Sequence, residues 1–261
     1  MQQPKKIKII SLSITPIRFT QALEKVAELG FAHQSSFVCF ANAHMTVEAY
    51  KDAQFLYFLN QATLVLADGK PIAKACAFFY GIKQERIAGM DFMPALLKHV
   101  NQLNKVVKVF LLGSTQEMIT AIKQKIKITY TQIEIVGNAT PPFREFSMEE
   151  TTEIIDSINQ SGAHIVFVSL GCPKQEKWMA ENFKSINAVL LGVGGAFSVF
   201  TGLKSRAPKW MQEYGFEWLY RLLQEPNRLF KRYAYTNIFF VWLFLKECTN
   251  KRSYLNECSN N

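Results

Sequence analysis

Several features are scarce in this sequence, and each scarcity excludes a class of protein. The cysteines are odd in number and none forms a C-x-x-C pair, which excludes a disulfide scaffold and favours buried free thiols in a reducing cytosol. The N-terminus lacks the apolar segment and cleavage site of a secretory signal. The longest apolar run, 238–245, is far shorter than the ~20 residues that span a bilayer. We therefore expect a cytoplasmic globular protein. The cysteines are Cys39, Cys76, Cys172, Cys248 and Cys258.

Motifs for metal and serine chemistry are also missing. The four histidines are scattered without an H-E-x-x-H pattern, and no D-x-D triplet is present to hold a divalent cation on a diphosphate. No G-x-S-x-G occurs, so a serine nucleophile has no support. A phosphate-handling site in this chain would need arginine or lysine to supply its positive charge. We expect no metal and no cofactor.

What the sequence does contain is a large apolar fraction and an excess of positive charge. Hydrophobic residues make up 49% of the 261 positions, which is ample for a core and excludes a disordered chain. Lys and Arg number 30 against 21 Asp and Glu, which gives a net charge of +9. This charge fits three kinds of partner: nucleic acid, an anionic membrane surface or a phosphorylated ligand.

Short apolar runs alternate with helical patterns along most of the chain. One helix start is marked by a capping box, because Ser147 is followed three residues later by Glu150. Strands without a polar face, separated by amphipathic helices, are typical of a parallel sheet covered on both faces. We predict an α/β fold with a Rossmann-like parallel sheet, and ligands beyond the carboxyl ends of its strands. The expected strands are Ser36–Ala41, 63–67, 107–112, 133–136, 164–170 and 188–191.

Four of these strands end in residues that suit ligand binding. The ends read Asn42-Ala43-His44, Asp68-Gly69, 171–176 (GCPKQE) and 192–197 (GVGGAF). Glycine turns let backbone N–H groups approach a phosphate, but tight strand-to-helix turns explain the same glycines equally well. The last segment lacks the third glycine of a dinucleotide fingerprint.

Asp68 is the carboxylate of most interest. It directly follows an apolar strand, so at the mouth of the sheet it can be partly desolvated and act as a general base. The alternative is an N-cap for a helix over 71–79, a position that aspartate suits. The residues alone favour the cap.

The segment 204–261 has a character of its own. Ten Lys/Arg against five Asp/Glu give it a net charge of +5, and its basic residues alternate with aromatic ones. Such a pattern suits stacking on nucleic-acid bases, contact with a lipid interface, or a helical subdomain with its rings packed inward. The apolar run 238–245 must contact another surface. Because no nucleic-acid-binding motif accompanies it, we favour membrane or protein contact and predict a helical basic appendage to a domain over 1–203.

Seven short segments match one known family in order and approximate spacing. They are ADG at 67–69, ERIAGMD at 85–91, VFLLG at 109–113, GCPKQEKW at 171–178, VGGAF at 193–197, RAPKW at 206–210 and EWLYRLLQEP at 217–226. In these segments the chain resembles the bacterial WecG/TagA/CpsF glycosyltransferases, glycosyltransferase family 26, over about residues 36 to 235.

This resemblance implies an inverting, metal-independent sugar transfer. The sugar would be N-acetylmannosamine, its uronic acid or a hexose, carried from a UDP-sugar to a polyprenyl-diphosphate-linked GlcNAc-type acceptor. The products would be bacterial surface polysaccharide or teichoic acid. The enzyme would lie peripherally on the cytoplasmic face of the cell membrane and self-associate, with no nucleic acid as partner.

The resemblance also implies roles for individual residues. Asp68 matches the family's proposed base, which takes the proton of the acceptor hydroxyl as that oxygen attacks the anomeric carbon, so its expected role changes from cap to base. By position, Asn42 would contact the sugars, whereas Arg86 and Gln175 would face the diphosphate and donor. The nucleotide-binding positions would be Pro142, Phe143, Gly194 and Gly195, and the arginines that contact the leaving group or the membrane would be Arg221, Arg228 and Arg232.

Two positions depart from the family pattern, and two other functions stay open. Ala41 stands where some members have threonine, and Ser198 where some have aspartate, so the contacts to the substrate and to the ribose or uracil are in question. One alternative is a nucleotide-dependent oxidoreductase that uses the glycine turns. The other is a basic nucleic-acid-binding module that uses the C-terminal aromatic residues.

Overall fold

The computed structural model describes residues 5–142 and 144–259, and at residues 228 and 251–259 it describes the backbone alone. Its strands are β1 Ile7–Ile9, β2 Leu12–Ile14, β3 Ser36–Ala41, β4 Leu64–Ala67, β5 Val107–Gly113, β6 Ile133–Ala139, β7 Ile165–Ser169 and β8 Val189–Gly192. Its helices are α1 Phe19–Phe31, α2 Ala43–Lys51, α3 Ala53–Asn60, α4 Lys70–Tyr80, α5 Gly89–Asn101, α6 Gln116–Thr129, α7 Met148–Ser161, α8 Lys174–Asn182, α9 Ala196–Thr201, α10 Lys209–Tyr214, α11 Glu217–Gln224 and α12 Pro226–Ser259. A short 3₁₀ turn, Phe183–Ser185, follows α8.

A parallel sheet of six strands organises the chain, in the order β4-β3-β8-β7-β5-β6. Side chains alternate across it: Phe37 and Cys39 of β3 belong to the core on one face, whereas Val38 and Phe40 belong to the core on the other. Both faces are therefore buried, which is why the strands read as continuous apolar runs. The predicted α/β fold with a covered parallel sheet is confirmed.

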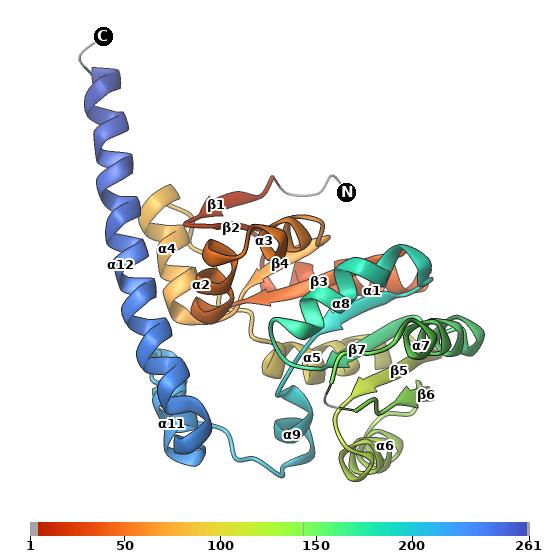
Figure 1. The fold of residues 1–261 in the computed structure, drawn as a ribbon. Helices are drawn as coiled ribbons and strands as arrows, with labels where there is room; N and C mark the ends of the chain where they lie inside the picture. Colours follow the sequence, from red (N-terminus) through yellow and green to blue (C-terminus); the bar gives the residue numbers. More distant parts are fainter. Residues whose placement is uncertain (1–4, 143, 260–261) are drawn as a thin grey trace.

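Helices cover each face of the sheet (Figure 1). Buried residues of α1, α5, α6 and α9 form the core on one face. Buried residues of α2, α3, α4, α7, α8 and α12 form the core on the other face. The capping box of α7 is present, with Ser147 accepting from the Glu150 N–H and the Glu150 carboxylate accepting from the Ser147 N–H.

The N-terminal strands β1 and β2 form a small antiparallel hairpin that the sequence analysis did not anticipate. It leads to Thr15, which lies beside the outer strand β4. The Thr15 N–H donates to the Val65 carbonyl at 2.9 Å, and the Val65 N–H donates to the Thr15 hydroxyl at 3.1 Å. These bonds occupy backbone groups at the edge of the sheet, which limits pairing with another chain.

The long helix α12 runs along the outside of α2 and α4 and projects beyond them at its C-terminal end (Figure 1). Phe240 and Leu243, from the apolar run 238–245, are buried in the core against these helices. The Phe244 ring contacts the rings of Phe78 and Phe79 at centroid distances of 5.3 and 5.1 Å. One side of the run therefore packs inward, while Ile238 and other residues on its opposite side stay exposed.

Within the described part of the chain, no helix is both long enough and apolar enough to cross a membrane.

Candidate functional site

A cleft of about 320 Å³ opens at the carboxyl ends of three neighbouring strands. Ser114, Ser169 and the Gly194-Gly195 turn line it from the ends of β5, β7 and β8. The segment 204–225, which includes α11, lines the facing wall. The cleft thus lies where ligands bind in open α/β sheets, between the strand ends and the C-terminal segment.

The glycine turn and Arg221 meet inside this cleft. Gly194 has a φ of +51°, which favours glycine, and a Cβ placed on Gly195 would lie 3.1 Å from Arg221 Nη2. The guanidinium of Arg221 therefore rests directly on the Gly195 backbone, where any larger residue would displace it. Arg221 forms no salt bridge with another residue in the described ranges. This brings together three of the residues expected to contact the nucleotide and its leaving group.

Gln175 has a different position, beneath the strand ends. It is buried, and its amide nitrogen donates to the Gly192 carbonyl at 2.9 Å and to Glu176 Oε1 at 2.7 Å. Its amide oxygen accepts the Gly171 N–H at 3.2 Å. These contacts join the loop after β7 to the end of β8, so in this arrangement Gln175 supports the glycine turns and does not line the cleft.

Asp68 directly follows β4 and is half-buried. Its N–H donates to the Ala41 carbonyl at 2.7 Å, which ties it to the end of β3. Gly69, with a φ of +103°, occupies the N-cap of α4, and no side chain caps that helix. The interpretation of Asp68 as the helix cap is therefore wrong: no hydrogen bond to its carboxylate occurs among the described residues.

The surroundings of Asp68 raise the pKa of its carboxyl group. Burial raises the pKa of its carboxyl group to about 7; the charges of Arg86 and Arg221 oppose this rise, and those of Glu217 and Asp91 add to it. A carboxylate with a pKa close to neutral both accepts and releases a proton readily near pH 7. It therefore suits a general base better than an exposed aspartate does.

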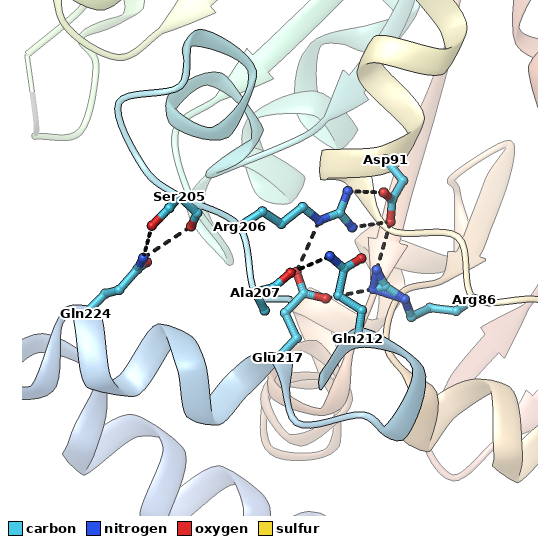
Figure 2. A network of polar contacts seen from close by, with 8 residues as sticks. All are labelled: Arg86, Asp91, Ser205, Arg206, Ala207, Gln212, Glu217 and Gln224. Carbon is cyan, nitrogen blue, oxygen red and sulfur yellow. Dashed lines mark hydrogen bonds and ion pairs between the residues drawn. The ribbon is translucent and has the colours of Figure 1, made fainter. Parts of the chain in front are cut away.

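Arg86, Asp91, Arg206 and Glu217 form a cluster of four charges (Figure 2). Each of the four is close enough to Asp68 to interact with its carboxyl group electrostatically. Arg86 Nη1 donates to Glu217 Oε2 and its Nη2 donates to Asp91 Oδ2, both at 2.8 Å. Arg206 donates to both Asp91 oxygens through its two terminal nitrogens. The cluster joins the start of α5 to the start of α11, so it fixes the C-terminal segment over the sheet.

One member of this four-charge cluster was predicted from the sequence and three were not. Arg86 was expected to face the diphosphate of the substrate; its guanidinium is paired with two carboxylates. Asp91, Arg206 and Glu217 were not assigned any role, although each lies in a segment that carried the family resemblance. Asp91 is 115 residues from Arg206, and Arg86 is 131 residues from Glu217, so nothing in their spacing reveals that they meet.

Asn42 and Arg232 lie around the start of α2: Asn42 is its N-cap, and Arg232 faces His44 in its first turn. The Asn42 side chain accepts the Met45 N–H at 3.1 Å and so caps α2 at the end of β3. Burial lowers the pKa of His44 on α2, and the positive charge of Arg232 from α12 lowers it further. Neither Asn42 nor Arg232 lines the 320 Å³ cleft, and Pro142 does not line it either.

Two of the expected site residues cannot be placed. Phe143 lies outside the described residues, and so does the side chain of Arg228. Within the described part of the chain, no group of three or more His, Cys, Asp or Glu side chains is arranged to hold a metal ion.

Comparison with known proteins places this geometry in context. The profile of the glycosyl transferase WecG/TagA/CpsF family matches residues 7–254, which include the sheet, the cleft and most of α12. The chain belongs to this family. It is therefore a glycosyltransferase, and this membership decides against an oxidoreductase and against a nucleic-acid-binding module.

Two relatives are similar over nearly their whole length. A protein of Bacillus subtilis (strain 168), 31% identical over 82% of this chain and 80% of its own, is named N-acetylglucosaminyldiphosphoundecaprenol N-acetyl-beta-D-mannosaminyltransferase. A protein of Staphylococcus aureus (strain MW2) with the same name is 31% identical over 86% of this chain and 87% of its own. The WecG/TagA/CpsF glycosyltransferase described here is thus similar to them over more than four fifths of its length.

Proposed function

We propose that this glycosyltransferase moves N-acetylmannosamine from a UDP-sugar to a polyprenyl-diphosphate-linked N-acetylglucosamine, for the synthesis of a bacterial surface polymer. The names of the two relatives support this donor sugar and this acceptor. The observation that carries the proposal is the Asp68 carboxylate, which is free of hydrogen bonds within the described structure, has a raised pKa and lies at the strand ends.

In the proposed reaction Asp68 is the general base. It takes the proton of the acceptor hydroxyl while that oxygen forms a bond to the anomeric carbon of the donor. The bond from this carbon to the diphosphate breaks, its electron pair leaves with UDP, and the configuration inverts. Positioned proton transfer of this kind contributes about 10²–10⁴-fold to a rate.

The leaving group would be held by the glycine turn and Arg221. The backbone N–H of Gly195, at the turn that Gly194 forms, and the guanidinium of Arg221, which has no salt bridge among the described residues, would provide the positive potential that a diphosphate requires. The Gly194 N–H itself donates to the Val168 carbonyl at 3.3 Å. Because the guanidinium would stabilise the charge that develops on UDP, its contribution would be greatest in the transition state. We propose that it does so without a metal ion.

We further propose that the enzyme binds peripherally to the cytoplasmic face of the membrane through α12. Ile238, Val241, Trp242 and Leu245 are exposed on one side of this helix. Lys246 Nζ lies 5.1 Å from the centroid of the Trp242 ring, which pairs a cation with an aromatic residue as at a lipid headgroup boundary. Self-association stays a prediction of the family resemblance.

The reaction is tested by Asp68→Asn. With UDP-N-acetylmannosamine and a short-chain polyprenyl-diphosphate-GlcNAc, product formation measured by mass spectrometry should fall by at least about 10²-fold, because the amide accepts no proton. UDP affinity should stay within about twofold. Asp156→Asn, an exposed change on α7, should have full activity. An active Asp68→Asn variant would show that another group is the base, and product from a different UDP-sugar alone would correct the donor.

A further inference from the structure

The guanidinium of Arg86 is close to Asp68 and yet is not paired with it. The Ile87 N–H donates to the Ala67 carbonyl at 2.8 Å, so the residue after Arg86 is fixed beside the residue before Asp68. The two terminal nitrogens of Arg86 point instead to Glu217 and Asp91, and its side chain is only 11% exposed (Figure 2). The loop that follows α4 therefore places the Arg86 guanidinium near Asp68. The carboxylates of Glu217 and Asp91 bind this guanidinium, so it does not pair with Asp68.

A direct pair between Arg86 and Asp68 would weaken the base. An arginine within hydrogen-bonding distance stabilises the ionised carboxylate and lowers its affinity for protons. A general base is most effective when its proton affinity is close to that required at the working pH. The reaction proposed above thus requires that Arg86 stay near Asp68 without bonding to it.

We propose that Glu217 is a positioning residue for sugar transfer: it holds Arg86 Nη1 and so prevents this guanidinium from pairing with Asp68. This inference rests on the proposed role of Asp68 as the base. It gives the C-terminal segment a part in the chemistry, because Glu217 is the first residue of α11, whereas Arg86 and Asp68 belong to the loops of the sheet.

The contacts single out Glu217 over Asp91. Asp91 is shared, since it accepts from Arg206 as well as from Arg86. The only hydrogen bond that the described residues give to the Glu217 carboxylate comes from Arg86, through Oε2. The other oxygen, Oε1, is buried without a hydrogen bond and lies 3.9 Å from Arg206 Nε, which is also unpaired. Glu217 is thus directed at Arg86 by its one hydrogen bond, whereas its ion pair with Arg206 is longer.

The charges around Asp68 act on its pKa in the directions that the proposed role of Glu217 requires. Arg86, Arg221 and Arg206 are the cations that face it, and Glu217 and Asp91 are the anions. The negative charge of Glu217 raises the pKa of Asp68, whereas Arg86 lowers it. In Glu217→Gln the anion is lost and Arg86 Nη1 is released, so both changes lower the pKa of Asp68.

Carboxyl NMR tests this directly, because the sequence contains only four aspartates: Asp52, Asp68, Asp91 and Asp156. In full-length protein labelled with ¹³Cγ-aspartate, Asp68→Asn identifies the Asp68 signal, which should titrate near pH 7. In Glu217→Gln its midpoint should fall by about one pH unit. Glu217→Asp keeps the negative charge, so the midpoint of Asp68 should stay close to its value in the natural chain. Glu213→Gln, an exposed change on α10, should leave the midpoint unchanged.

A double-mutant cycle separates positioning from bulk charge. In an Arg86→Gln background, Glu217→Gln should shift the midpoint by less than half as much as it does in the natural chain, since no guanidinium is left to release. Equal shifts in the two backgrounds would overturn the proposal, and so would an unchanged midpoint in a folded Glu217→Gln variant. The pH below which kcat/KM falls should shift in each variant by the same amount as the NMR midpoint of Asp68.

The role of Asp68 as the base and the role of Glu217 as a positioning residue are tested by different measurements. The NMR midpoint is read without substrate, so it judges the role of Glu217 whether or not Asp68 is the base. An active Asp68→Asn variant overturns the proposed role of Asp68 as the base. An inactive Asp68→Asn variant combined with an unmoved Glu217→Gln midpoint overturns only the positioning role.

Discussion

At the scale of single residues, the burial of Glu176 makes the free energy of unfolding depend on pH. It is fully buried, its Oε2 has no hydrogen-bond partner in the described structure, and burial raises its pKa from 4.5 to about 7. The groups that face it are the Gln175 amide and the thiols of Cys172 and Cys39. Because the folded chain keeps this proton and the unfolded chain loses it above pH 4.5, the free energy of unfolding falls as the pH rises through about 7.

Glu176→Gln should therefore stabilise the protein more at pH 8 than at pH 5. The amide has the shape of the protonated acid and no charge to bury, so the difference between the two pH values should be on the order of 2 kcal/mol. Urea unfolding at both pH values measures it. Glu181→Gln on the same helix is exposed and serves as the control. Equal effects at pH 5 and pH 8 would mean that Glu176 is ionised in the folded protein.

The sequence alone identified some of the site residues but could not predict where their side chains point. Asp68 was found because a carboxylate directly after an apolar strand has a defined place in a parallel sheet. Gln175 was found through its motif, but its side chain turns inward to Gly192, a choice that depends on the packing of β8 and α8. Glu217 was missed because its partner Arg86 is 131 positions away in the chain.

At the scale of elements, the strands were the easiest to predict and short or outlying elements the hardest. Strands β3, β4, β5 and β7 are buried on both faces, so composition alone marks them. The three-residue strands β1 and β2 are too short to show a period, and α1 and α5 received no prediction. Helix α12 was expected only as a helical appendage, since its inward packing depends on the aromatic residues of α2 and α4.

The outer side of α12 is where membrane binding is tested. Replacing Ile238, Val241 and Leu245 together by serine should cut binding to phosphatidylglycerol vesicles at least about tenfold, because each side chain is more than half exposed and would enter the lipid boundary. Co-sedimentation measures this, and the melting temperature should change little. The matched control replaces Ile128 and Met148 by serine, two exposed apolar residues on α6 and at the start of α7. Equal binding by the triple variant and the control would contradict a lipid-facing α12.

At the scale of the whole molecule, the proposed division into 1–203 and 204–261 does not coincide with a gap in packing. Leu229, Phe240 and Leu243 of α12 are buried, and Phe240 and Leu243 belong to the same core as the strands. Arg206 and Glu217 tie the same segment to Arg86 and Asp91. The C-terminal segment thus serves the site and also completes the fold.

A pair of truncations follows from this packing. A chain that ends at residue 225 loses three buried apolar side chains, so its free energy of unfolding should fall by on the order of 5 kcal/mol, with a matching fall in melting temperature. A chain that ends at residue 246 keeps every described contact of α12 with α2 and α4, and it should melt with the full-length protein. Calorimetry distinguishes the two. Equal melting temperatures for the chain of 225 residues and the full-length protein would show that α12 is an independent appendage, and only then would its removal report membrane contact alone.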